Sequence, residues 1–207
     1  MIHQILAVGP LQCNCHILAD EASKEAIIVD PGDDPEEILR RVKGYTVRAL
    51  LHTHCHFDHM TGTRRVAEAT GAEILIHQAD KAYYDSLAGQ YRMFGMPRPV
   101  EDPLPVKRFL KDGDRIDFGK HGLEVIHTPG HTQGSCCFHA EGKLLSGDTL
   151  FQRSIGRTDL PGGNAGQELD SIRKRLFTLD PETIVYPGHG PETQIGEERA
   201  ENPFLAG

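Results

Sequence analysis

The segment from His52 to His59 constrains this chain most, because it places four histidines and one aspartate within eight positions. It directly follows residues 47–51, an apolar run that predicts a short buried strand. Alternate side chains of an extended segment share a side, so we expect His54 and His56 to point at one ion. Asp58 and His59 come where the chain turns toward the next helix, and we expect them to face a second ion nearby.

Imidazole nitrogens and carboxylate oxygens suit zinc, iron or manganese, and this set of side chains requires no thiolate. The alternative is a histidine-rich surface loop. Because the segment follows a buried strand and is not of low complexity, the metal site is the favoured interpretation.

Three further candidate ligands, His131, Asp148 and His189, stand in sharp turns that each follow a predicted strand. Each has a neighbouring glycine, which permits a tight backbone that raises the side chain above the strand end. Each turn is weak evidence alone, but polar side chains gathered on loops at one rim of a sheet are typical of an active site.

The order His-x-His-x-Asp-His, Pro-Gly-His, Gly-Asp and Pro-Gly-His resembles the metallo-β-lactamase-fold superfamily, and within it the glyoxalase II-like hydrolases. The likeness extends from Asp30-Pro31-Gly32 to Asn202-Pro203-Phe204. It implies an α/β fold, an αββα four-layer sandwich with the metals at one edge. It further implies one metal on His54, His56 and His131, a second on Asp58, His59 and His189, and Asp148 bridging both.

Bulk properties agree with a single domain over residues 1–207, since this length supports one sizeable core. Strands outnumber helices and alternate with them in blocks, which favours a layered α/β sandwich. The net charge of -8 argues against a nucleic-acid partner. No apolar run approaches the roughly 20 residues that cross a bilayer. Five scattered cysteines and no visible secretory signal favour a cytoplasmic location. The oligomeric state stays open.

The pattern predicts the following elements. Strands are expected at residues 2–8, 15–18, 26–29, 47–51, 73–77, 136–139, 143–146 and 183–186, and hairpin strands over 108–126. Helices are expected after Asp34 as an N-cap, over 62–70 and 166–177, and in the tail from residue 193. Residues 89–105, with four prolines, are expected to form an irregular apolar loop.

Asp30 ends a predicted buried strand, and metal-bound imidazoles usually need a carboxylate or carbonyl behind them. Asp30 is therefore either such a supporting carboxylate or a simple turn cap. Cys55 lies between two ligands, but alternation directs its side chain away from the metal, so we expect it to pack in the core. His52 is expected to support the backbone, and the remaining histidines to be structural or surface residues.

The chain has no Gly-x-Ser-x-Gly motif and no P-loop, so we expect metal-dependent chemistry. The expected cofactors are two divalent ions, zinc first, with iron or manganese as alternatives. A bound metal lowers the pKa of water from 15.7 to about 7. We expect the resulting hydroxide to attack an acyl carbonyl, with Asp58 orienting it.

Arg92-Met93-Phe94-Gly95 and Gly156-Arg157-Thr158-Asp159 resemble short bacterial glyoxalase II-like proteins, which implies a small-molecule glutathione thioester such as S-lactoylglutathione as substrate. Long members of that group continue past the last histidine into a helical region that holds the glutathione tail, whereas this sequence stops at Gly207. We therefore expect Arg157 to anchor a substrate carboxylate, with residues 91–97 as a lid. The alternative is that Arg157 pairs internally with Asp159 or Asp30.

Other functions on the same residues stay open. A mononuclear-iron persulfide dioxygenase shares Thr53-His54-Cys55-His56, but the last motif of that group departs from the Pro-Gly-His-Gly that is intact here. Lactonase and β-lactamase are further hydrolytic options within the fold. Net acidity counts against an RNA-processing nuclease. A purely structural metal is usually held in a closed, cysteine-rich shell of four ligands, unlike this set of seven.

Overall fold

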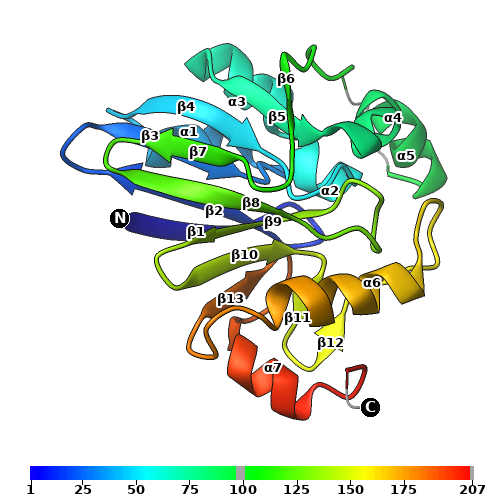
Figure 1. Cartoon of the computed structure of the whole chain (residues 1–207). Coiled ribbons are helices and arrows are strands. Elements are labelled where there is room, and N and C mark those ends of the chain that lie inside the picture. Colours follow the sequence, from blue (N-terminus) through cyan, green and yellow to red (C-terminus); the bar gives the residue numbers. More distant parts are fainter. Residues whose placement is uncertain (97–100, 206–207) are drawn as a thin grey trace.

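The computed structural model describes residues 1–96 and 101–205. Two six-stranded β-sheets face each other, and helices cover the outer face of each sheet (Figure 1). The N-terminal half of the chain forms the first sheet with its helices, and the C-terminal half forms the second.

The first sheet contains β1 (Ile2–Val8), β2 (Cys13–Asp20), β3 (Glu25–Val29), β4 (Thr46–Leu51), β5 (Glu73–His77) and β6 (Arg108–Leu110), in that spatial order. The pairs β1–β2 and β2–β3 are antiparallel, and the pairs from β3 to β6 are parallel. The parallel half of this sheet carries the His52–His59 segment, which begins directly after β4.

The second sheet contains β7 (Arg115–Phe118), β8 (His121–His127), β9 (Cys136–Ala140), β10 (Lys143–Gly147), β13 (Ile184–Pro187) and β14 (Thr193–Gln194). Its spatial order is β14-β13-β10-β9-β8-β7, with only β10 and β13 parallel. Strands β8, β10 and β13 therefore all end at the same edge of the sheet. A small hairpin of β11 (Leu150–Phe151) and β12 (Ser154–Ile155) follows β10.

The helices are α1 (Pro35–Arg41), α2 (Phe57–Met60), α3 (Thr63–Thr70), α4 (Lys81–Asp85), α5 (Leu87–Met93), α6 (Ala165–Ser171) and α7 (Ile195–Glu201). A 3-10 turn, η1 (Gln78–Asp80), precedes α4, and a π-helical segment, η2 (Ile172–Leu176), continues α6. Over the described parts of the chain, no helix has the length and apolar character needed to cross a membrane.

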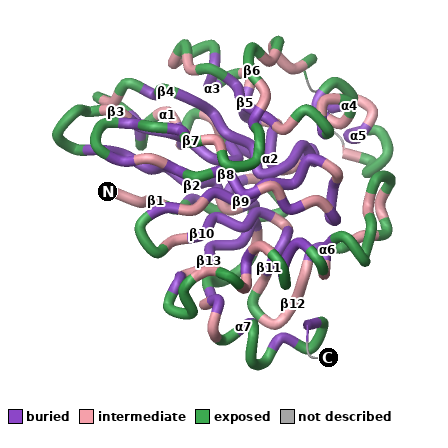
Figure 2. The backbone as a smooth tube through the Cα atoms, in the orientation of Figure 1, coloured by how far each residue is buried: buried purple, intermediate pink, exposed green. Residues whose placement is uncertain are grey.

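Three apolar clusters separate the four layers, and the buried backbone runs through the two sheets (Figure 2). Ile38 and Val66 of the helices pack on the first sheet. Leu51 and Phe138 meet between the two sheets. Ile172 packs on the outer face of the second sheet. This helix–sheet–sheet–helix order confirms the predicted α/β four-layer sandwich. Cys55 lies fully buried in the first cluster, as its packing interpretation predicts.

The prediction of an irregular loop over residues 89–105 is wrong at its start, where α5 continues to Met93. Leu87, Gln90 and Tyr91 are buried at spacings of three and four residues, so a short amphipathic stripe stabilises this helix. Gly89 and the prolines that begin at Pro97 obscured the pattern. Residues 97–100 of the predicted loop, and the end of the predicted lid with them, lie outside the described residues.

Two further predictions need correction. Residues 108–126 are not one hairpin run, because β6 pairs in parallel with β5 in the first sheet and only β7 and β8 form a hairpin. Asp34 precedes α1 but makes no side-chain cap. It adopts a φ of 48°, and its Oδ2 accepts a hydrogen bond from the Gly9 amide at 2.9 Å instead.

Candidate metal centre

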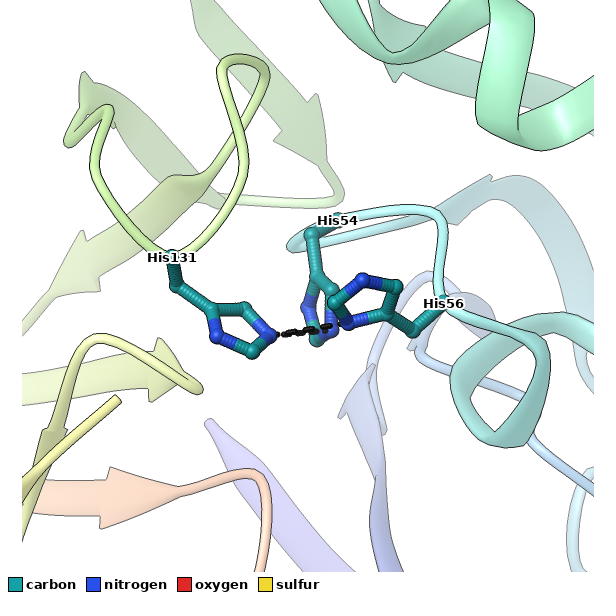
Figure 3. A group of neighbouring side chains, drawn as sticks. All are labelled: His54, His56 and His131. Carbon is teal, nitrogen blue, oxygen red and sulfur yellow. Dashed lines mark hydrogen bonds between the residues drawn. The ribbon is translucent and has the colours of Figure 1, made fainter. Parts of the chain in front are cut away.

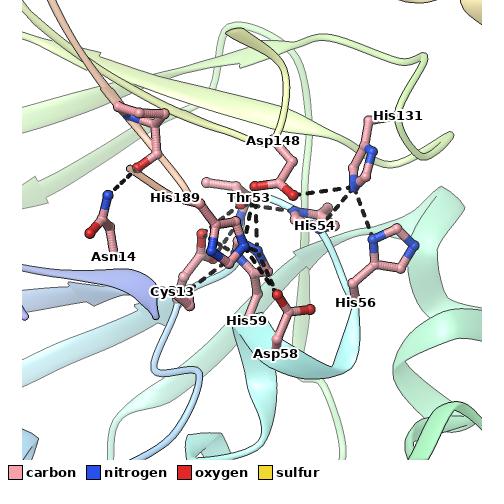
Figure 4. Close-up of polar contacts among 12 residues, drawn as sticks. Cys13, Asn14, Thr53, His54, His56, Asp58, His59, His131, Asp148 and His189 are labelled. Carbon is pink, nitrogen blue, oxygen red and sulfur yellow. Dashed lines mark hydrogen bonds and ion pairs between the residues drawn. The ribbon is translucent and has the colours of Figure 1, made fainter. Parts of the chain in front are cut away.

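All seven side chains predicted as ligands lie together at one edge of the sandwich (Figure 4). His54 and His56 come from the loop after β4, and Asp58 and His59 from α2. The loops after β8, β10 and β13 contribute the other three, which are His131, Asp148 and His189. Both sheets therefore supply donors to the same place.

The first group of donors consists of three buried imidazoles, those of His54, His56 and His131 (Figure 3). The Nε2 atom of His131 lies 3.2 Å from His54 Nε2 and 2.9 Å from His56 Nδ1. Burial lowers the pKa of His54 well below its usual value and lowers the pKa of His56 to about 3. These rings are thus neutral at pH 7, as metal ligands must be.

The second group combines two imidazoles with a carboxylate, those of His59, His189 and Asp58. His59 Nε2 lies 3.2 Å from His189 Nε2, which in turn lies 3.1 Å from Asp58 Oδ2. Burial disfavours the charge of Asp58, but the neighbouring His59 and His189 outweigh it and hold the pKa of this carboxyl below its usual range. Asp58 is therefore an anionic donor at neutral pH.

Asp148 stands between the two groups. Its Oδ1 lies 3.4 Å from His59 Nε2, and its Oδ2 lies 3.7 Å from His131 Nε2. Gly188 makes this approach feasible, because a Cβ atom there would lie 2.3 Å from Asp148 Oδ1 and 2.7 Å from His59 Cε1. One carboxylate thus offers one oxygen to each group.

The hydrogen bonds behind the rings fix which nitrogen faces the centre. Nδ1 of His131 lies 2.7 Å from the carbonyl oxygen of Arg157, and Nδ1 of His189 lies 3.0 Å from that of Leu11. Carbonyl oxygens only accept hydrogen bonds, so each Nδ1 carries a proton and Nε2 is the nitrogen that faces the centre. The same holds for His59, whose Nδ1 lies 3.1 Å from Asp30 Oδ2.

Burial opposes charge on His59 and His189, but the neighbouring carboxylates outweigh it and raise the pKa of both rings, so the 3.2 Å contact between their Nε2 atoms lies where a cation is stabilised. Nitrogens bound at about 2.0–2.1 Å to a tetrahedral ion are about 3.3 Å apart. The contacts within both groups are close to this value. Asp148 Oδ1 is also buried without a hydrogen-bond partner among the described residues. The donor sets therefore fit a metal ion in each group.

Asp30 lies directly behind His59, where the sequence places a supporting carboxylate or a turn cap. Besides His59, it accepts hydrogen bonds from the Thr53 amide at 2.8 Å and the Thr53 hydroxyl at 2.6 Å. Thr53 Oγ1 lies in turn 3.1 Å from His54 Nδ1. A single buried carboxylate thus orients, directly or through Thr53, one ring of each group.

Two buried carboxylates beside the ligand loops escaped the sequence analysis. Asp80 accepts hydrogen bonds from the Cys55 amide at 3.0 Å, the Thr132 hydroxyl at 2.8 Å and the Gly134 amide at 2.7 Å. It therefore ties the first sheet's ligand loop to the loop of His131. Its position just after β5, the neighbour of β4, was the available signal.

Glu168 is the other missed carboxylate, and its Oε2 accepts a hydrogen bond from the His131 amide at 2.7 Å. Burial raises the pKa of Glu168 to about 8. No motif marks this residue, because it lies inside a helix more than 30 positions from its partner.

Arg157, the predicted anchor, lies in the wall of a cavity of about 160 Å³ that also includes His56, Asp58 and Asp148. Its guanidinium pairs with Asp159 through Nε and Nη2, both at 2.8 Å. The internal pairing that we weighed as an alternative is thus present. The side chain is 57% exposed, so solvent still reaches it at the rim of the cavity.

A two-sheet sandwich with histidine and aspartate donors at one edge defines a class of metal-dependent enzymes. The family model that describes sequences of the metallo-β-lactamase superfamily matches residues 8–189. The chain belongs to that superfamily. The hydroxyacylglutathione hydrolase GloC of Haemophilus influenzae is 36% identical, over 98% of this chain and 97% of that protein. The probable metallo-hydrolase YqgX of Bacillus subtilis is 39% identical, over 98% and 96%.

Three solved structures show the same fold. BLEG-1, a B3 metallo-β-lactamase, has a TM-score of 0.91 and 38% identity, with full coverage of both chains. TTHA1623 in a di-iron-bound form has a TM-score of 0.87 and 38% identity, over 98% of this chain and all of the other. ETHE1 from Myxococcus xanthus has a TM-score of 0.81 and 30% identity, over 98% and 84%.

Proposed function

We propose that this chain is a dinuclear metallohydrolase that cleaves a thioester, in particular a glutathione thioester such as S-lactoylglutathione. The observation that carries the proposal is the position of Asp148, whose two oxygens face two separate donor groups. Assigned roles follow from this geometry. His54, His56 and His131 hold one divalent ion, Asp58, His59 and His189 hold the other, and Asp148 bridges them. Zinc is our first choice, and iron or manganese suits the same donors.

The substrate class draws on the relatives. GloC, a hydroxyacylglutathione hydrolase, matches over nearly the whole of both chains. A small-molecule substrate is also consistent with the cavity beside the donors, which His56, Asp58 and Asp148 line together with Arg157.

Two bound ions would supply hydroxide at neutral pH and polarise the scissile carbonyl. The chain's own residues do the rest. The ionised Asp58 accepts a hydrogen bond from the attacking water and so directs its lone pair at the carbonyl carbon. Asp30, Arg157 and Leu11 hold the rings of His59, His131 and His189 through fixed acceptors, so the donors need no rearrangement during turnover.

The test is metal analysis together with hydrolysis of S-lactoylglutathione under anaerobic conditions. We expect close to two metals per chain and oxygen-independent release of thiol, with activity lost on chelation and restored by zinc, iron or manganese. Reconstitution that never exceeds one metal per chain contradicts the dinuclear assignment. Failure to cleave any thioester contradicts the proposed reaction.

A persulfide dioxygenase is the second candidate function, and the observation in its favour is the likeness to ETHE1 at 30% identity. A mononuclear-iron persulfide dioxygenase needs oxygen and one metal, whereas the second donor group here is complete. Oxygen uptake with glutathione persulfide, and no thioester cleavage, would establish that alternative. BLEG-1 makes a β-lactam a useful third substrate in the same assay.

A further inference from the structure

A second cavity, of about 410 Å³, opens beside the metal centre between α4, α5 and the loop before α6. It shares His56, Phe94 and Leu160 with the cavity that contains Asp58 and Asp148, so the two cavities adjoin. This volume lies in the usual range for small-molecule sites. A substrate whose reacting carbon sits at the metals therefore has room for one of its arms in this space.

The described residues that line this second cavity include no charged side chain. Apart from the His56 ring, whose Nε2 is buried without a hydrogen-bond partner among the described residues, the polar side chains of the lining make hydrogen bonds within the protein. Gln90 donates to the carbonyl oxygens of Cys55 and Tyr83, both at 2.9 Å, and accepts from the Phe57 amide at 3.0 Å. Ser86 donates to the Tyr83 carbonyl oxygen at 3.0 Å. These walls therefore offer a ligand apolar surface.

Tyr83 of α4 closes one side of the cavity, where it contacts the loop before α6. Its hydroxyl donates to the carbonyl oxygen of Pro161, and its ring meets the His56 ring edge-on, with centroids 5.3 Å apart. The rim is apolar as well, since Met93 is 67% exposed and Phe94 is 42% exposed. Large apolar side chains left open to water beside a site are typical of a surface that a ligand covers.

We propose that this cavity takes an apolar acyl chain, which makes acyl thioesters with apolar chains better substrates than S-lactoylglutathione. This inference rests on the proposed thioesterase function and specifies its acyl group. The polar thiol carrier lies on the other side of the scissile bond, at the solvent-exposed rim near Arg157. A lactoyl hydroxyl inside the apolar cavity would lose its hydrogen bonds to water without replacement.

The test keeps the carrier constant and varies only the acyl chain. Glutathione thioesters of acetate, propionate, butyrate, hexanoate and lactate are compared by kcat/KM. We expect a rise of about fourfold for each methylene that enters the cavity. Propionyl and lactoyl differ by one hydroxyl, and we expect kcat/KM for the lactoyl thioester to be lower than for the propionyl thioester.

Gly89 of α5 lines the cavity and offers a way to fill it. A Cβ at this position meets nothing closer than 3.8 Å, so a side chain can enter without disturbing the backbone. Gly89→Leu should lower the ratio of hexanoyl to acetyl kcat/KM at least tenfold. Ala88→Leu adds bulk at the neighbouring position of the same helix, outside the lining of the cavity, and should leave that ratio within twofold.

Met93→Glu provides a second variant at an exposed position, so folding is not at risk, and it should lower the same ratio at least fivefold. Metal content and melting temperature of each variant are measured in parallel. A flat chain-length profile, or a Gly89→Leu variant with an unchanged ratio, overturns the inference while the thioesterase function stands. If no thioester of any length is cleaved, both proposals fall together.

Discussion

Two clusters of histidines in this molecule use the same side chain in opposite ways. At the edge that carries the seven donors, Nδ1 of His131 and of His189 is hydrogen bonded to a carbonyl oxygen, and the Nε2 atoms converge. On β1 and β2, His3 Nε2 instead lies 3.1 Å from His16 Nδ1, and both rings pack against Tyr186. One ring of that pair can donate to the other, so it needs no ion.

The difference shows what separates a metal site from a packed histidine cluster. Proximity alone does not, because ring nitrogens lie about 3 Å apart in both places. The distinguishing observation is that the outer nitrogens of His59, His131 and His189 already have acceptors. Their inner nitrogens then face the centre, an arrangement that a cation stabilises.

The largest effect is expected for Asp148→Ala, because it removes a donor from both groups. We expect metal content to fall at both positions and kcat/KM for a thioester to fall at least a thousandfold, since the ions supply the nucleophile. Asp170→Ala removes an exposed carboxylate on α6 and serves as the control, with full metal content and activity. An Asp148→Ala protein that retains two tightly bound metals would remove the bridging role.

A smaller effect is expected for Asp30→Asn, which tests whether orientation of the ring matters apart from the donors. An amide replaces a carboxylate that accepts from His59 and twice from Thr53. We expect metal affinity at the second group to fall about 10- to 100-fold, with a lesser change at the first. Asp20→Asn alters another buried carboxylate, at the end of β2 opposite to the donor groups. This variant should leave the metal affinity of both groups unchanged.

The smallest effect is expected for the cluster of His3 and His16. It concerns how the free energy of unfolding depends on pH. Burial, with a contribution from Lys143, lowers the pKa of His3 to about 4, and burial lowers that of His16 to about 3. As the pH falls, these two histidines therefore take up protons in the unfolded chain before they do so in the folded chain. Their contribution to the free energy of unfolding is present above pH 6.5 and is lost as the pH falls toward 4. His3→Gln should reduce the acid-induced loss by on the order of 1–2 kcal/mol.

Denaturant unfolding of wild type and His3→Gln between pH 7 and pH 4 measures this difference. Contributions from carboxylates are common to both proteins and cancel. Parallel stability curves for the two proteins would show that the cluster does not titrate on unfolding.

The sequence predicted the layers and the donor positions for a physical reason. Ligands at strand ends follow buried apolar runs, which can be recognised in the sequence. What the sequence did not predict depends on contacts between distant segments. Asp80 and Glu168 act on loops 25 to 54 and 37 positions away, and α5 is stabilised by packing that overrides Gly89. Neither these long-range hydrogen bonds nor the packing of α5 produces a local pattern in the sequence.

Each proposed ion would take ligands from both sheets, and this makes the ions cross-links between the two halves of the chain. His54 and His56 precede the crossing near Lys111 from the first sheet to the second, and His131 follows it. Asp58 and His59 likewise precede that crossing, and His189 follows it. A chain divided at this crossing would leave no complete group in either fragment, so metal uptake by mixed fragments would report their reassembly.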